Sequence, residues 1–319
     1  MTLPLEPPLK PQLALSRKEL PEGEDYTYEI KLDGFRCLAF VDGGDVFLQS
    51  RNGKPLGRYF PELRFPAGRY VLDGEIVVRD AHGREDFDAL GQRIHPAVSR
   101  IERLSIETPS IYVAFDLLAH EQDSLLDLPF AERRAALERL LASEAFARAP
   151  VELMPTAATA AEARQWLEHA EGAIAKERSA PYRPGERKGM AKVKRMRTID
   201  AIVVGWRPGK EPRTVGALIL GLYDDSELRV VGHCSGLSAA EKKRLVGFLG
   251  PYESGERGSA DPSRWSAGKE LEWVALRPEL VVEIDFDHVS AGRIRHGAKL
   301  RRWREDKPPR ECTFEQLYT

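Results

Sequence analysis

The sequence has few cysteines and no long apolar run. Its three cysteines, Cys37, Cys234 and Cys312, are scattered along 319 residues and form no CxxC pair. Neither a zinc finger nor a disulfide framework is therefore expected, and a reducing cytosol is the expected compartment. No window approaches the roughly eighteen apolar residues that a membrane span needs, so no membrane association is expected. The N-terminal stretch MTLPLEPPLKPQ is proline-rich, without the apolar core of a signal peptide.

The sequence also lacks a strong charge imbalance. Its formal net charge is −2, although 31% of the residues are charged. A protein that is basic over its whole surface is therefore excluded. If nucleic acid is the partner, the positive surface that binds it must be local.

The length is enough for two domains, and the pattern changes near residue 200. The first part mixes β-rich runs with helical spacing over residues 131–142 and 159–170, which predicts an α+β domain. From Asp200 onward most segments read as strands, with one helix over residues 238–249. Such a series of short strands with one helix predicts an all-β barrel of the OB type. We place the domains at residues 1–198 and 199–319.

The segment YEIKLDGFRCLAF, residues 28–40, places charged residues inside a half-apolar strand pattern. Lys31 is followed by Asp33, Gly34 and Arg36. The simplest interpretation is a strand that ends in a turn, with solvated charges. The alternative is that Lys31 is a nucleophile, since a free lysine amine, with a pKa of about 10.4, is activated by desolvation or nearby cations. Asp33 and Arg36 would then contact metal, sugar or phosphate.

Further short motifs follow in order: SRNG at 50–53, DGE at 73–75, FD at 115–116, EGAIAK at 171–176, KVK at 192–194 and RRWREDK at 301–307. Each is weak alone, because turns, exposed strand faces and solvated tails produce similar patterns. Their order and spacing together resemble the ordered motifs of the covalent nucleotidyltransferases, which include ATP-dependent DNA ligases, RNA ligases and mRNA capping enzymes. The stretches LQSRNGKPLGRYFPEL and YVAFDLL are most similar to small bacterial ligases of the ligase C type and to the ligase domain of ligase D.

The resemblance implies a nucleotidyltransferase (adenylation) domain with antiparallel sheets, followed by an OB-fold domain. It implies that Lys31 attacks the α-phosphate of ATP and carries AMP as a phosphoramidate. Arg36 and Glu75 would hold the ribose, Glu29 would lie near the adenine, and Phe115 would stack on the purine.

The same resemblance assigns residues to the phosphates and the metal. Lys192 and Lys194 would neutralise the α-phosphate and, with Lys31 and Asp33, complete the catalytic set. Glu171 and Asp33 would bind the divalent cation, Mg²⁺ or Mn²⁺. Arg51 would receive the 5′-phosphate of the nick.

The C-terminal motif RRWREDK is implied to act on the leaving group. Arg302, Asp306 and Lys307 would orient pyrophosphate, and Arg302 is preferred to Arg304 only by its spacing to the aspartate. The expected partner is nicked double-stranded DNA, gripped locally by a monomer in the bacterial cytosol or nucleoid. Repair proteins as recruiting partners are a family-level expectation.

Three alternatives stay open on the residues alone. A capping enzyme would use GTP, and an RNA ligase usually lacks the OB domain. A catalytically silent OB-fold module would bind nucleic acid through the basic and aromatic stretch RIRHGAKLRRWR, residues 293–304. An NAD-dependent ligase is disfavoured, because three dispersed cysteines cannot build its four-cysteine zinc module and only 30 residues precede Lys31.

Overall fold

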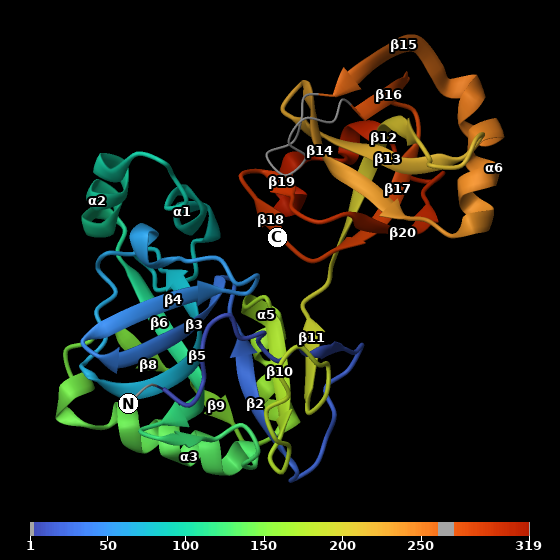
Figure 1. Ribbon diagram of the computed structural model, residues 1–319. Helices are drawn as coiled ribbons and strands as arrows, with labels where there is room; N and C mark the ends of the chain where they lie inside the picture. Colours follow the sequence, from blue (N-terminus) through green and yellow to red (C-terminus); the bar gives the residue numbers. More distant parts are fainter. Residues whose placement is uncertain (1–2, 261–270, 319) are drawn as a thin grey trace. The chain divides into compact units, whose positions relative to one another are not determined.

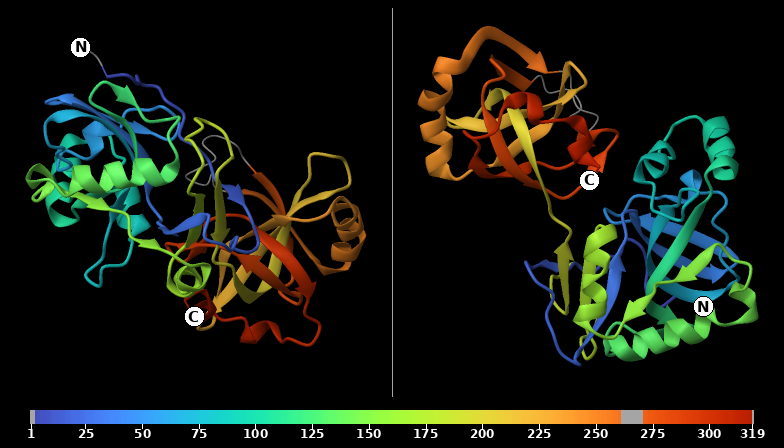
Figure 2. Two further views of the ribbon diagram at one scale, coloured as in Figure 1. Left: turned by 90° about the horizontal axis from the view of Figure 1, so that it is seen from below. Right: turned by 180° about the vertical axis from the view of Figure 1, so that it is seen from behind.

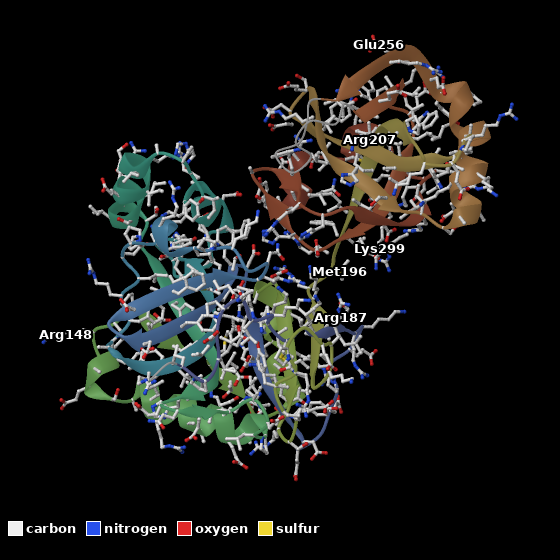
Figure 3. All side chains as sticks on the ribbon, viewed as in Figure 1. Arg148, Arg187, Met196, Arg207, Glu256 and Lys299 are labelled. Carbon is white, nitrogen blue, oxygen red and sulfur yellow. The ribbon has the colours of Figure 1, made fainter. Side chains whose placement is uncertain are left out.

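The computed structural model describes residues 3–260 and 271–318 of the chain. The chain divides into two compact units, Met1–Arg195 and Met196–Thr319, shown in Figure 1. The residue that begins the second unit, Met196, is half exposed (Figure 3). Each unit has its own apolar core and is described by itself.

The first unit contains a five-stranded sheet in the order β1-β11-β10-β2-β9. Its strands are β1 (Leu15–Ser16), β2 (Tyr26–Lys31), β9 (Thr156–Ala157), β10 (Gly172–Glu177) and β11 (Met190–Lys194). All these pairings are antiparallel except the parallel pairing of β1 with β11.

The two faces of this sheet differ because side chains alternate along each strand. Tyr28, Ala173, Ala175, Ala191 and Val193 belong to one buried cluster, into which helix residues also pack. Lys31, three residues after Tyr28, and Lys192, between Ala191 and Val193, therefore point to the opposite face. One face is closed by apolar packing and the other presents charge.

The second sheet of this unit has the order β4-β3-β5-β6-β7, with β8 parallel to β6. Its strands are β3 (Phe35–Gly43), β4 (Asp45–Ser50), β5 (Gly68–Val78), β6 (Ser110–His120), β7 (Asp123–Ser124) and β8 (Val151–Leu153). The turn DGGD joins β3 to β4, and Gly43 takes a φ of +64° there.

The helices of the first unit are α1 (Phe87–Gln92), α2 (Val98–Glu107), α3 (Phe130–Leu141), α4 (Ala160–Arg164) and α5 (Trp166–His169). The helix expected over 131–142 is present as α3. The region expected to be one helix over 159–170 forms two short ones, α4 and α5, which contact β2 and β10. Figure 2 gives two further views of these elements.

The second unit closes a five-stranded ring. Strand β12 (Arg197–Pro208) pairs with β13 (Val215–Asp224), β13 with β14 (Glu227–Gly236), β14 in parallel with β20 (Ala298–Trp303), β20 with β17 (Val281–Phe286), and β17 with β12. Helix α6 (Ala239–Leu249) lies between the third and fourth ring strands in sequence and begins with a Ser238–Glu241 capping box. This order is that of the OB barrel, and the predicted fold class is confirmed.

The remaining strands of this unit lie outside the ring. Strands β15 (Glu253–Ala260) and β16 (Leu271–Leu276) extend the sheet from β12, and β18 (Val289–Ser290) pairs with β19 (Arg293–Ile294). Residues 298–303, which overlap the charged motif RRWREDK, form the fifth ring strand β20. The barrel has a continuous apolar core in which Cys234 and Cys312 are buried.

All three cysteines are buried free thiols. Within residues 3–260 and 271–318, no helix has the length and apolarity required to cross a membrane.

Candidate active site

Adjacent strands of the first sheet align three residues of the proposed site. Gly172 of β10 is directly opposite Lys31 of β2 on one side and Lys194 of β11 on the other. The residue before this glycine, Glu171, forms ion pairs with both lysines: its Oε2 contacts Lys31 Nζ and its Oε1 lies 3.5 Å from Lys194 Nζ. Three motifs that are far apart in sequence therefore meet around one carboxylate.

The cations gather around Lys192. Burial lowers the pKa of Lys192, and the positive charges of Lys31, Lys194 and Arg51 lower it further. Arg51 lies in the turn after β4, where Ser50 and Lys54 exchange hydrogen bonds. Because the positive charges of Lys31, Lys194 and Arg51 all act on Lys192, the site is suited to an anion with several negative charges, such as a polyphosphate.

Two motif positions require glycine, because a neighbouring strand's backbone lies too close to leave room for a Cβ. A Cβ on Gly172 would clash with the carbonyl oxygen of Val193, and one on Gly34 would clash with that of Ile76. Gly34 therefore allows β3 to pack against β5.

Arg36 is fixed by a buried network. Its Nε and Nη2 donate to Asp73 Oδ1 and Oδ2 at 2.8 and 2.6 Å, and its Nη2 also donates to the Gln12 carbonyl oxygen at 3.1 Å. The Tyr182 hydroxyl donates to Asp73 Oδ2 at 2.6 Å and accepts from the Gln12 backbone N–H at 2.9 Å. Burial alone would lower the pKa of Arg36, but Asp73 raises it overall.

The Phe115 ring contacts two cationic side chains, Arg36 and Lys176. Its side chain is 8% exposed and packs with Leu32 and Met154. The Arg36 guanidinium lies 4.8 Å from its ring centroid, and Lys176 Nζ lies 4.6 Å from the same centroid.

Glu29 is deeply buried next to Phe115. Lys176 Nζ lies 2.9 and 2.8 Å from its two carboxylate oxygens and donates to the Phe115 carbonyl oxygen at 3.1 Å. Burial raises the pKa of Glu29, and Lys176 opposes that shift. The pair is an internal ion pair of the kind that needs all its hydrogen bonds satisfied.

Two further carboxylates lie close to Lys31 in space or in sequence. Burial raises the pKa of Glu75 to about 7, although Lys31 and Arg36 lower it. Glu75 is directly opposite Arg36 in the pairing of β3 with β5. Asp33 lies in the loop after β2, where its charge helps to raise the pKa of Glu85, after the larger effect of burial.

The C-terminal motif residues belong to the second unit. Arg302 Nε donates to Glu283 Oε2 at 2.5 Å, and Lys307 Nζ lies 2.7 Å from Glu311 Oε2. Asp306 accepts from Arg304, which lowers the Asp306 pKa to about 2. Arg304, set aside in the sequence interpretation, also forms an ion pair with Asp200.

Sequence reasoning missed several residues of the site. Gln12 and Tyr182 were not singled out, and Asp73 and Lys176 received no role. The proline-rich context of Gln12 gave no signal, and Tyr182 carries no motif. Lys176 ends the EGxxxK motif, so that signal was present but was not used.

Comparison with known families agrees with this geometry. The family model described as "ATP dependent DNA ligase domain" matches residues 11–194, and "ATP dependent DNA ligase C terminal region" matches residues 211–307. The chain belongs to the ATP-dependent DNA ligases. The predicted family and enzyme class are thereby confirmed.

Two curated relatives of this ligase are similar over nearly their full length. DNA ligase C1 of Mycolicibacterium smegmatis is 43% identical over 340 residues, which cover 100% of this chain and 96% of the relative. DNA ligase C of Mycobacterium tuberculosis is 42% identical over 347 residues, covering 99% and 96%. Among solved structures, the ligase domain of M. tuberculosis LigD is 29% identical with a TM-score of 0.53, covering 96% of this ligase and 98% of that chain.

This ligase uses ATP as its nucleotide cofactor, together with the usual divalent metal ion. Among residues 3–260 and 271–318 no group of three or more His, Cys, Asp or Glu is placed to chelate a metal. A metal bound by one or two carboxylates and by the phosphates of the nucleotide fits such a site, which is the usual mode for Mg²⁺. Glu171, with its carboxylate between two lysines, has the chemistry for that role.

Proposed function

We propose that this ligase seals nicks in duplex DNA and that Lys31 is its nucleophile. The observation that carries the proposal is the alignment of Lys31, Gly172 and Lys194 across three strands, with Glu171 between the lysines. A lysine held in this way among cations is placed to meet the α-phosphate of ATP.

In the first step, Lys31 Nζ, after losing a proton, forms a P–N bond to the α-phosphate while the bond from that phosphorus to the bridging oxygen breaks. Pyrophosphate leaves, and the lysine carries AMP. Lys192 and Lys194 neutralise the charge that accumulates on the α-phosphate. Glu171 and Asp33 would hold the divalent metal, which supplies charge neutralisation when bound.

The nucleoside is held by residues on both sheets. Phe115 stacks on the base and Glu29 lies at its edge. Arg36, fixed by Asp73, and Glu75 hold the ribose. The Arg36 network is preorganised, so that little ordering is needed when the nucleotide binds.

In the second step AMP passes to the 5′-phosphate of the nick, which Arg51 receives. In the third step the 3′-hydroxyl attacks that phosphate, the strand is joined and AMP leaves. Nicked duplex DNA is the proposed partner, bound by a monomer in the cytosol. Because phosphate contacts dominate such binding, we expect DNA affinity that falls steeply with salt; a flat response would contradict local electrostatic binding.

The C-terminal motif is proposed to act only in the first step. Arg302, Asp306 and Lys307 orient pyrophosphate as the leaving group. Alanine variants at these positions are expected to slow adduct formation with ATP and to seal a nick that is already adenylylated at the normal rate. Equal loss in both assays would contradict this division.

The proposal is tested by the intact mass of the wild type and of Lys31→Ala after incubation with ATP and Mg²⁺ or Mn²⁺. An AMP adduct on the wild type alone supports it. The untreated mass is measured first, and any bound AMP is removed with pyrophosphate. An adduct with GTP in place of ATP would favour the capping reaction, and no adduct with either would favour a silent binding module. Nicked DNA compared with nicked RNA then decides between the two ligase substrates.

A further inference from the structure

Strand β20 presents two neighbouring arginines to the outside of the barrel. Glu283 of β17 lies opposite Arg302 of β20, the neighbouring strand (Figure 1). The next residue of β17 lies opposite Leu300, so Arg301 is the extra residue of a β-bulge. Successive side chains of a regular strand point to opposite faces, but here Leu300 packs against the barrel core and both arginines are exposed. The bulge therefore turns two guanidinium groups outward together.

One carboxylate contacts both of these arginines. Glu283 Oε1 lies 3.1 Å from Arg301 Nη1, and Glu283 Oε2 accepts from Arg302 Nε at 2.5 Å. The Glu283 side chain is 13% exposed, and the hydrogen bond from Arg302 lowers its pKa. Asp285 and Thr198 also contact Arg301, at 3.5 and 3.2 Å. Ion pairs that form such a network hold their geometry better than an isolated surface pair.

Arg304, two residues further along the chain, is already engaged within its own unit. Its Nε and Nη2 donate to the two oxygens of Asp306 at 2.9 and 2.8 Å. Its Nη1 donates to both oxygens of Asp200, at 2.9 and 3.0 Å. Each nitrogen of this guanidinium therefore has a carboxylate partner, and Arg304 ties Asp306 to the barrel.

Arg301 and Arg302 keep nitrogens that are available to a ligand. An arginine has five N–H donors on three nitrogens. Arg302 donates through Nε, and Arg301 donates through Nη1. Within residues 3–260 and 271–318, neither terminal nitrogen of Arg302 and not the Nη2 of Arg301 forms a hydrogen bond. The two side chains are 62% and 50% exposed.

We propose that Arg301 binds the leaving pyrophosphate together with Arg302, and that Glu283 is the positioning residue that holds both guanidinium groups. The inference rests on the proposed function, in which Arg302 orients pyrophosphate. A carboxylate that holds Arg302 at Nε leaves the two terminal nitrogens to form the fork that binds phosphate oxygens in pairs. A second arginine on the same side suits a leaving group that carries several negative charges.

The charge of Glu283 gives the proposal a distinctive sign. If Glu283 only neutralised the arginines, its removal would leave more positive charge for pyrophosphate and would strengthen binding. If it holds the arginines in position, its removal lets their long side chains move, and binding becomes weaker because they must be ordered again. The positioning role therefore predicts a loss where simple charge balance predicts a gain.

The first step is measured in both directions on the full chain. Lysyl-AMP formation from ATP is followed by intact mass, and its reversal is followed by adding inorganic pyrophosphate to the AMP-loaded protein. Arg301→Met is expected to raise the KM for pyrophosphate and to lower kcat/KM for ATP, each by about tenfold, because a charged hydrogen bond is lost. Arg301→Lys is expected to restore part of the loss, since it keeps the charge without the fork. An Arg301→Met variant that behaves as the wild type would overturn the assignment.

Glu283→Gln tests the positioning role with a substitution of nearly the same shape. It is expected to raise the KM for pyrophosphate by about five- to tenfold. Glu279→Gln is the matched control, because Glu279 accepts from Arg277 at 2.6 Å in an exposed pair of the same unit. Tighter binding of pyrophosphate by Glu283→Gln, or an equal effect of Glu279→Gln, would overturn the positioning role.

A further comparison separates positioning from general support of the fold. In a chain that already carries Arg301→Met and Arg302→Met, Glu283→Gln is expected to change the KM for pyrophosphate no further. A further loss of the same size would show that Glu283 acts on the fold and would overturn the proposal. Every variant is expected to seal an already adenylylated nick at the normal rate, because that step involves no pyrophosphate; an equal loss there would also contradict the proposal.

The outcomes distinguish this proposal from the proposed function. A wild type that forms no adduct on Lys31, or an Arg302→Ala variant whose first step is normal, contradicts the proposed function. A first step that is slowed by Arg302→Ala but unchanged by Arg301→Met and Glu283→Gln overturns only the present inference. If Glu283→Gln does not fold, Arg301→Met and Arg301→Lys decide whether Arg301 binds pyrophosphate.

Discussion

The first unit buries charged side chains in pairs, whereas the second unit keeps them at the surface of an apolar barrel. Every charged side chain that is buried among residues 3–260 and 271–318 belongs to the first unit: Glu29, Asp73, Arg93, Asp116, Arg133, Arg134 and Lys176. In the second unit the one buried polar side chain among the described residues is Thr214.

The difference reflects what each unit must do. Buried ion pairs are costly to desolvate and are kept where fixed geometry is needed, as around Lys31 and Phe115. Surface ion pairs contribute little to the free energy of unfolding and can exchange partners easily. A nucleotide site needs the first kind, while the barrel carries its charges in surface pairs of the second kind.

The largest effect is expected from breaking the Arg36 network. Asp73→Asn leaves Arg36 and Tyr182 without their charged acceptor, so the free energy of unfolding should fall by about 3 kcal/mol. Adduct formation on Lys31 should fall about tenfold or more, because Arg36 loses its orientation. Urea unfolding and intact mass measure the two effects. Retained activity in a destabilised variant would show that Arg36 needs no anchor.

The ion pair of Arg93 with Glu62 is the matched control for Arg36 and Asp73, because it lies outside the proposed nucleotide contacts. It is fully buried and donates to both oxygens of Glu62, at 2.6 and 2.8 Å. Arg93→Met should lower the free energy of unfolding by about 2–3 kcal/mol, and adduct formation per folded molecule should be unchanged. A loss of activity beyond the unfolded fraction would contradict the distinction between the site network and structural pairs.

Glu75 should make stability depend on pH. Its folded pKa of about 7 is above its ordinary value of 4.5, so the folded state binds the proton more tightly than the unfolded chain. The stability from this group is present below about pH 4.5 and is lost as pH rises through about 7, on the order of 2 kcal/mol from pH 5 to 8. The difference between wild type and Glu75→Gln in urea midpoints across that range measures it. A difference that does not vary with pH, or that favours the wild type at high pH, would contradict the sign.

The smallest effect is expected at a surface pair of the barrel. Arg229 Nη1 lies 2.6 Å from Asp224 Oδ2, and both side chains are substantially exposed. Arg229→Gln should change the free energy of unfolding by less than about 1 kcal/mol. A double-mutant cycle with Asp224→Asn measures the coupling free energy of the pair. A value above about 2 kcal/mol would contradict the expectation that surface ion pairs of the second unit contribute less to stability than buried pairs of the first.

Much of the site follows from local sequence. The KxDG lysine, the glycines beside it and the alternation that puts Lys192 and Lys194 on one face are properties of single strands. The barrel strands and the capped helix α6 are predicted by short patterns of apolar and turn residues, because period and capping are local. The order of the motifs suffices to indicate the family.

Only the tertiary structure decided which distant residues complete the site. The Gln12–Tyr182 hydrogen bond joins residues 170 positions apart, and the Tyr182–Asp73 bond joins residues 109 apart. Arg134 sits in a helix whose sequence reads as an ordinary solvated one, yet the structure buries its side chain 3.9 Å from Glu29 Oε1. Sequence determines which groups a strand or helix carries, but the pairing of sheets determines which of them meet, because register and packing depend on contacts far along the chain.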